Sequence, residues 1–330
     1  MVAAMSSRLS DYDYVLPEHL VAHRPLPRRE DSRMMVLHRN DQSIEHRMFA
    51  DFESYLRSGD LVVLNNTRVL PARRFSDDGK IELLFLERLE ARRWKCLVKP
   101  GRKMKVGAAI RVAGSVARVE TILADGERII ALEREIDMQA GGLLPLPPYM
   151  ERQSDVEDET RYQTVFAEVP GALAAPTAGL HFTAEILNRI PHTFVTLHVG
   201  TGTFRPVQSE NLSEHRMHTE SFSISAETAK SVNEARRIVA IGTTTVRVIA
   251  SADRVNGAIV KQESATEIFI RPPHEFKSVD LMLTNFHLPR STLLMLVSAF
   301  AGREFILAAY AEAIREKYRF FSYGDCMLII

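Results

Sequence analysis

The sequence has little of what several large classes of protein need. It contains only two cysteines in 330 residues, Cys96 and Cys326, which lie far apart and match no metal-ligand spacing. A disulfide framework is therefore excluded, and a reducing compartment is indicated. The longest apolar run, 293–301, is interrupted by Ser298 and is much shorter than the roughly 20 residues of a membrane-spanning helix. The N-terminal segment also lacks the basic start and apolar core of a signal peptide, so we expect a cytoplasmic protein without membrane association.

The chain also has no excess of charge and lacks several catalytic motifs. With 42 basic and 42 acidic residues its formal net charge is zero, so any surface that binds nucleic acid must be local. It has no G-x-S-x-G, no H-E-x-x-H, and no glycine-rich nucleotide loop around 238–247. His215, His218 and Glu220 lie within six residues but without such a spacing, so we expect no metal site and favour acid–base or hydrogen-bonding roles.

Residues 61–140 have the pattern of a small β-structure. Short apolar-rich segments alternate there with turn signals such as Asp77-Asp78-Gly79 and Asp125-Gly126, and no segment has helical length and periodicity. This predicts a small antiparallel barrel or sandwich. The expected strands are 61–64, 81–89, 94–98, 109–112, 116–123 and 128–132.

Beyond about residue 160, strand-like runs alternate with helix-like ones, which is typical of an α/β core. We expect strands at 194–199, 238–241 and 267–270, and helices at 226–238, with Ser225 as N-cap, and at 303–317. The length of the chain favours two domains. The predicted fold is an α/β domain, formed by 1–67 plus 151–330, with a small antiparallel β-barrel domain inserted at 68–150.

Five runs rich in Gly, Thr, His and Arg have the composition of a binding site, because they combine close backbone approach, hydrogen-bond donors and imidazoles. They are 175–183 (APTAGLHFT), 195–206 (VTLHVGTGTFRP), 215–220 (HRMHTE), 241–247 (IGTTTVR) and 284–292 (TNFHLPRST). They predict an enzyme with a large polar substrate.

Two of these runs also have simpler explanations. Run 195–206 follows a strand, where ligands usually bind in open α/β sheets, but its glycines also suit a hairpin-like turn. Run 241–247 begins a helix whose free N–H groups attract anions, although one threonine there would serve as an ordinary N-cap.

A basic stretch at 88–105 carries eight Lys or Arg against one Glu, with Trp94 among them. Arg68, Arg73 and Arg74 precede it. Such a β-surface suits an RNA backbone. A solvated edge strand protected by charge explains the same residues equally well.

Together these segments closely resemble the S-adenosylmethionine:tRNA ribosyltransferase-isomerase family of queuosine biosynthesis. The resemblance is collinear from about residue 11 to the C-terminus. It rests on 11–17 (DYDYVLP), 59–73 (GDLVVLNNTRVLPAR), 145–149 (PLPPY), 161–183, 195–206, 241–247, 280–303 and 318–330. The chain departs from the family pattern at 77–80, at Pro272-Pro273 and at Cys326.

The resemblance implies that S-adenosylmethionine is a ribosyl-donor cosubstrate and that no cofactor is permanently bound. Its ribosyl group would be transferred to the 7-aminomethyl-7-deazaguanine base at a tRNA wobble position and isomerised, giving epoxyqueuosine, adenine and methionine. We expect a monomer whose proton transfers use His198, His218 and Glu220. Expected substrate contacts are Thr177, Gly179, His181, Thr201, Gly202, Thr203, Arg205, Thr243, Thr244, Arg247, Asn285 and His287, and expected tRNA contacts are Arg68, Arg73, Arg102 and Lys103.

Two other classes stay open from the sequence. One is a non-catalytic RNA-binding protein that uses the β-domain as its platform. The other is a metal-assisted hydrolase built on His215, His218 and Glu220.

Overall fold

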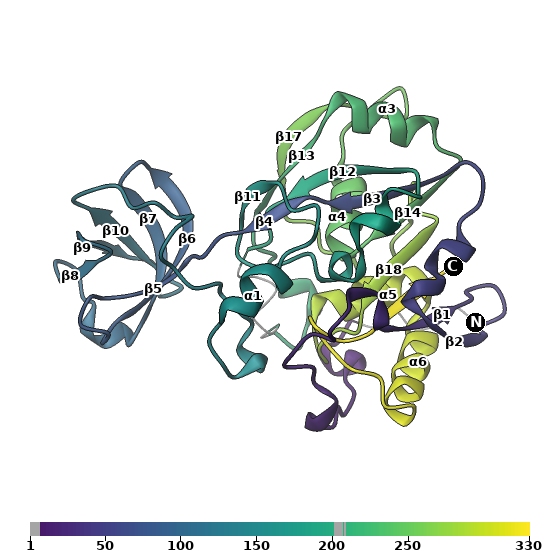
Figure 1. Ribbon diagram of the computed structural model, residues 1–330, viewed down its shortest axis with the longest axis horizontal. Coiled ribbons are helices and arrows are strands. Elements are labelled where there is room, and N and C mark those ends of the chain that lie inside the picture. The colour runs from purple at the N-terminus through teal and green to yellow at the C-terminus, as the bar shows by residue number, and fades with distance from the viewer. Residues whose placement is uncertain (1–6, 201–206, 208) are drawn as a thin grey trace.

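The computed structural model describes residues 7–200, 207 and 209–330. Its two main sheets are separate bodies: a nine-stranded sheet covered by helices, and a six-stranded sheet that stands apart at one side (Figure 1). Two extended segments, β4 (Thr67–Val69) and β11 (Val169–Ala172), pair in parallel where the chain passes between the two bodies.

The nine-stranded sheet is mixed, with a parallel centre. Its order is β17-β13-β12-β3-β14-β18-β19-β1-β2, and β12, β3, β14 and β18 run parallel to one another. The strand bounds are β1 Arg33–Leu37, β2 Ile44–Met48, β3 Asp60–Asn65, β12 His192–Leu197, β13 Glu220–Ile224, β14 Arg237–Ile241, β17 Gln262–Thr266, β18 Leu281–Asn285 and β19 Cys326–Ile329.

Both faces of the central strands are buried, which explains why their sequences are almost continuously apolar. On β3, Leu61 and Val63 belong to one core while Val62 and Leu64 belong to another. The first core includes side chains of α3 (Ala226–Glu234), α4 (Thr243–Ser251), α5 (Thr292–Ala301) and α6 (Arg303–Arg315). The second includes those of α2 (Ala184–Leu187) and the 3-10 helices η4 (Phe49–Tyr55) and η7 (Thr177–His181).

Most of the expected elements of this body are confirmed. The Ser225 side chain caps α3 by accepting a hydrogen bond from Thr228 N–H, although α3 ends at Glu234, four residues earlier than expected. The apolar run 293–301 forms the buried helix α5. Among the described residues no single helix is long and apolar enough to cross a membrane, and the pair α5 and α6, bent by 113°, meets that test only by length and composition.

The strand expected at 267–270 is wrong. The strand there is β17, Gln262–Thr266, and it ends because its partner β13 begins at Glu220, which pairs with Thr266. The apolar residues that follow, Ile268 and Ile270 among them, pack against the first core from an irregular segment.

The six-stranded sheet is antiparallel and nearly closed into a barrel. Its order is β5-β6-β7-β10-β9-β8, and Asp77 N–H donates to Arg111 O at 2.8 Å, which links the ends of the two edge strands. Every strand expected between 81 and 132 is confirmed to within two residues at each end. The bounds are β5 Arg73–Phe75, β6 Glu82–Glu90, β7 Arg93–Lys99, β8 Ala109–Val112, β9 Ser115–Ile122 and β10 Arg128–Leu132.

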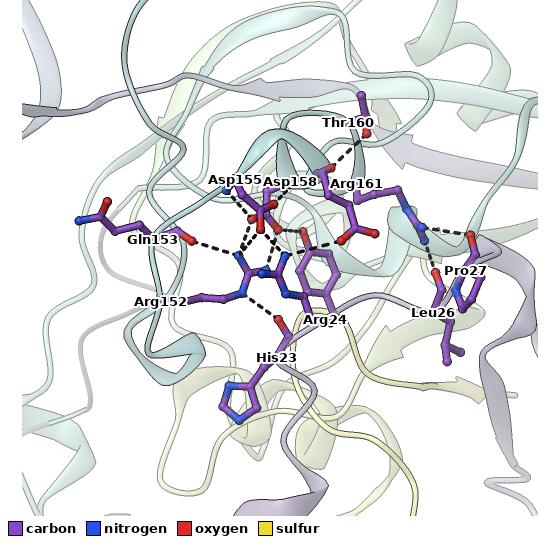
Figure 2. A network of polar contacts seen from close by, with 12 residues as sticks. His23, Arg24, Leu26, Pro27, Arg152, Gln153, Asp155, Asp158, Thr160 and Arg161 are labelled. Carbon is purple, nitrogen blue, oxygen red and sulfur yellow. Dashed lines mark hydrogen bonds and ion pairs between the residues drawn. The ribbon is translucent and has the colours of Figure 1, made fainter.

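A buried ion pair fixes the segment that returns from the barrel to the large sheet. Asp158, on α1 (Val156–Arg161), is fully buried and accepts from Arg152 at 2.5 and 2.8 Å and from Tyr323 Oη at 2.7 Å. Burial alone would raise the pKa of Asp158, but these bonds lower it to about 2. Figure 2 shows the same network reaching the N-terminal segment, where Arg152 donates to His23 O and Arg161 to Leu26 O.

Candidate active site

The carboxyl ends of the parallel strands bring together residues from all five polar runs. β3 is the first of these strands in the sequence, and its neighbours β12 and β14 lie on opposite sides of it. This is a topological switch point, where open α/β sheets bind ligands. Two adjacent hollows lie there, which we call the edge pocket and the barrel cleft; both are lined by Val199.

The edge pocket lies beside the start of α4. Its empty volume is about 730 Å³, a value that includes space open to solvent. Its wall combines the segments 174–178 and 284–288 with three aromatic residues, Tyr149, Tyr162 and Phe321.

The N-terminus of α4 faces this pocket without a side-chain cap. Gly242 precedes the helix with φ +85°, and in the part of the chain that the structure describes no side chain caps the first-turn N–H groups. Thr245 Oγ1 donates back to Ile241 O at 2.8 Å. Thr244 Oγ1, in contrast, is buried at the pocket without a hydrogen-bond partner among the described residues. The simpler explanation, that one of these threonines is an ordinary N-cap of the helix, is therefore wrong.

Arg247 extends the same donor surface. Its Nη1 pairs with Glu220 Oε2, and both side chains are at most 4% exposed. Its Nε and Nη2 have no hydrogen-bond partner among the described residues. Because leaving a buried donor unpaired costs free energy, the arrangement is suited to an acceptor supplied by a ligand. Glu220 Oε1 accepts from Gly200 N–H at 3.0 Å, so both carboxylate oxygens are engaged.

His198 follows β12 and lines the barrel cleft. Its Nδ1 lies 2.8 Å from Thr67 Oγ1. A side chain at Gly171 would meet the imidazole at 2.7 Å, so glycine is what allows the ring to lie against that backbone. Burial lowers the pKa of His198, which keeps the imidazole neutral at pH 7.

The barrel cleft separates the six-stranded barrel from the β12 and β13 end of the large sheet. His218 lines it and is exposed, and Glu220 lies at its inner wall. Acidic side chains contribute most of the charge on the barrel side. They are Glu87, Asp125, Glu127, Glu135 and Asp137.

Three of the expected substrate contacts have partners within the protein. His181 is buried, with Nδ1 2.8 Å from Ser32 Oγ and Nε2 3.1 Å from Asn285 Oδ1. His287 lines the edge pocket, with Nε2 3.0 Å from Thr284 Oγ1. Burial lowers the pKa of His181 to about 4 and that of His287 to about 3, so both are neutral at pH 7.

The remaining expected contacts divide into three groups. Thr177 and Thr243 line the edge pocket. Gly179 packs against another part of the chain, since a Cβ there would lie 2.8 Å from Phe166. The last group lies outside the described residues and comprises Thr201, Gly202, Thr203 and Arg205.

The expected tRNA contacts differ in exposure and in ion pairing. Arg102 and Lys103 are exposed on the 3-10 helix η5 (Gly101–Lys103), and Arg68 is exposed on β4. Arg73, however, pairs with Glu82 at 3.2 Å.

Much of the basic stretch on β6 and β7 is also paired, Arg88 with Glu135 and Lys95 with Glu87. Trp94 is only 8% exposed, and its ring packs edge-on against Phe85 in the barrel core. The expectation that Trp94 forms part of an exposed basic platform is therefore wrong.

The described residues contain no group of three His, Cys, Asp or Glu side chains placed to hold a metal ion. His215 packs edge-on against Phe269, and burial, followed by the charge of His218, lowers its pKa. Both cysteines are free and buried.

Sequence reasoning missed Thr67 beside His198 and the aromatic residues of the edge pocket. Tyr149 and Phe321 fall within segments already singled out, PLPPY and 318–330, but nothing in those segments distinguishes a pocket aromatic from a core aromatic.

Comparison with known proteins places the chain in a family. Residues 9–329 match the model of the family described as queuosine biosynthesis protein. A protein named S-adenosylmethionine:tRNA ribosyltransferase-isomerase from Sulfurihydrogenibium sp. (strain YO3AOP1) is 46% identical, with 98% of this chain and 100% of that protein covered. Another of that name from Symbiobacterium thermophilum is 48% identical over the same shares.

A solved structure is similar as well. The crystal structure of S-adenosylmethionine tRNA ribosyltransferase from Thermotoga maritima is 39% identical, with a TM-score of 0.54, and the match covers 97% of this chain and 100% of that one. The chain belongs to the queuosine biosynthesis protein family.

Proposed function

We propose that this chain is an S-adenosylmethionine:tRNA ribosyltransferase-isomerase. It transfers the ribosyl moiety of S-adenosylmethionine to the 7-aminomethyl-7-deazaguanine base at the tRNA wobble position and isomerises it. The products are epoxyqueuosine-tRNA, adenine and methionine. Full-length similarity to relatives of that name supports this assignment. S-adenosylmethionine is a cosubstrate here, and no permanently bound cofactor is invoked.

Hydrogen-bond donors without partners in the edge pocket are the main support for placing S-adenosylmethionine there. Thr244 Oγ1 and Arg247 Nε and Nη2 are buried without partners among the described residues, beside the uncapped N-terminus of α4. A carboxylate accepts several such bonds at once and is favoured by the positive end of a helix. The methionine carboxylate of S-adenosylmethionine is the group of the cosubstrate that fits this surface.

Glu220 acts in this proposal by holding Arg247. Each of its carboxylate oxygens already accepts a hydrogen bond, one from Arg247 and one from Gly200 N–H. An ion pair of that kind orients the guanidinium so that its other N–H groups face the pocket. This geometry supports a positioning role better than the proton transfer expected from the sequence.

His198 is the favoured base. It is neutral because burial lowers its pKa, and its Nδ1 is held by Thr67, so Nε2 is the nitrogen left for a proton. The sulfonium makes protons on the ribose carbons more acidic, and a neutral imidazole near the sugar can remove one. His218, which lines the same cleft, is the candidate for a second proton transfer.

The barrel cleft is the proposed entry for the tRNA base, with the tRNA backbone on Arg68, Arg102 and Lys103. These three cations are exposed, whereas Arg73 is held in an ion pair. We further propose an α/β domain, 1–67 plus 151–330, with an inserted β-barrel domain at 68–150. A cytoplasmic monomer without membrane association is consistent with a tRNA substrate.

Adenine release tests the function, and a pair of threonine variants tests the site. The wild-type protein should release adenine from S-adenosylmethionine when substrate tRNA is added, as followed by chromatography. Thr244→Val should raise the KM for S-adenosylmethionine by about tenfold or more, the usual value of a hydrogen bond to a charged group. Thr245→Val is the matched control, since Thr245 is fully buried, does not line the edge pocket and already donates its hydroxyl to Ile241 O of β14; it should leave that KM unchanged.

The result also separates this function from its alternatives. A wild-type protein that binds tRNA but releases no adenine would instead be a non-catalytic RNA-binding protein. If Thr244→Val and Thr245→Val have the same KM for S-adenosylmethionine, the proposed reaction still stands. The N-terminus of α4 is then not part of the S-adenosylmethionine site.

A further inference from the structure

Phe321 has a backbone conformation that its side chain does not favour. Its φ is +72°, in the left-handed region where a bulky residue is rare and glycine is common. A residue held in such a conformation at a pocket points to a function for its side chain, because glycine would occupy the same backbone without strain.

Several hydrogen bonds hold the backbone of Phe321. Its carbonyl accepts from Asn285 Nδ2 at 2.9 Å and from Gly324 N–H at 3.0 Å, and its N–H donates to Phe286 O at 3.3 Å. The Asn285 amide is itself oriented by His181 Nε2. His181 and Asn285 thus fix a strained aromatic residue in place.

The ring of Phe321 forms an aromatic wall of the edge pocket. It lies 4.7 Å from the ring of Tyr149, centroid to centroid, and both residues line the pocket. The wall is on the β18 side, since Asn285 ends β18. The guanidinium of Arg247 reaches away from this wall toward Glu220 on β13, which lies beyond β12, β3 and β14 from β18.

We propose that Phe321 is a specificity-determining residue that contacts the adenine ring of S-adenosylmethionine, and that His181 and Asn285 are positioning residues for it. The inference rests on the proposed function. A pocket whose lining combines a guanidinium that reaches toward β13 with aromatic rings on the β18 side fits a ligand with a carboxylate at one end and a planar base at the other. Aromatic faces recognise bases by stacking, which needs a ring at a fixed place.

Three substitutions at Phe321 and one at its neighbour test this proposal. Phe321→Leu removes the aromatic face, Phe321→Gly also removes the backbone strain, and Phe321→Tyr keeps an aromatic ring. Phe320→Leu is the matched control, because Phe320 is fully buried and does not line the edge pocket. The readouts are S-adenosylhomocysteine affinity by calorimetry, the KM for S-adenosylmethionine and for substrate tRNA, and the melting temperature.

We expect Phe321→Leu and Phe321→Gly to lose about tenfold or more in affinity, with the KM for tRNA unchanged and with Phe321→Tyr near wild type. The proposal is overturned if Phe321→Leu, folded as judged by its melting transition, binds S-adenosylhomocysteine as tightly as the wild-type protein and Phe320→Leu do. If the wild-type protein itself neither binds this ligand nor releases adenine, the proposed function fails, which is a different result.

Discussion

The buried imidazole of His181 should make the folded protein sensitive to mild acid. Burial, the largest influence, lowers its pKa from 6.5 to about 4, and the charges of Arg29 and Arg319 act in the same direction. The unfolded chain therefore takes up a proton on this side chain before the folded chain does. The contribution of His181 to stability is fully present above pH 6.5, is lost as the pH falls, and is gone near pH 4.

The size of the effect follows from the two pKa values. At 1.36 kcal/mol per pH unit, the difference between 6.5 and about 4 corresponds to about 3 kcal/mol in total. Most of that loss falls between pH 7 and pH 5, where the same linkage gives about 2 kcal/mol. His181 is fully buried, so solvent screening does not reduce this value.

Urea unfolding followed by circular dichroism at pH 7 and pH 5 measures the difference. The free energy of unfolding should fall by about 2 kcal/mol less in His181→Gln than in the wild-type protein, because glutamine takes up no proton. His19→Gln, at an exposed position, is the control and should keep the wild-type difference. The reasoning would be refuted if His181→Gln and the wild-type protein lost the same free energy between the two pH values.

Three further predictions concern the cleft, the barrel and the return segment. His218→Ala should lower turnover by about a hundredfold with the melting temperature unchanged, and a normal rate would remove His218 from the mechanism. Charge reversal of Arg102 and Lys103 together should weaken tRNA binding in a filter assay without changing the affinity for S-adenosylmethionine; loss of both affinities would contradict the separation of the two sites. Asp158→Asn should cost about 3 kcal/mol in urea unfolding because it leaves Arg152 without its charge partner, and a change below about 1 kcal/mol would show that the pair is dispensable.

The helices and strands that were predicted well from the sequence are those whose burial or turns are visible in the residue types themselves. Strand β3 is buried along its whole length, and its sequence is apolar from Leu61 to Leu64. Most of the barrel strands are separated by turns that contain glycine or aspartate, which set their ends; β6 and β7, joined by Ala91-Arg92, are the exception. The segment 267–270 has an equally apolar sequence, but its apolar residues are buried from an irregular backbone because β13 offers no further partner.

The candidate site was less predictable, because its geometry depends on how distant segments meet. The polar runs could be recognised from composition, but the pairing of Glu220 with Arg247 depends on the antiparallel addition of β13 to β12. Likewise, His181 and His198 occur in similar glycine- and threonine-rich contexts. Only the fold places the first in the interior, bonded to Asn285, and the second at the cleft. The positive φ of Phe321 has no trace in its sequence.

The parallel ladder of β4 and β11 lies where the chain passes between the six-stranded barrel and the large sheet. Among the described residues, everything that lines the edge pocket comes from outside the six-stranded barrel, whereas the cleft has one wall from each body. A rigid rotation of the barrel about this ladder would change the width of the cleft and leave the edge pocket as it is. With the proposed sites, loading of S-adenosylmethionine would therefore not depend on how the tRNA docks.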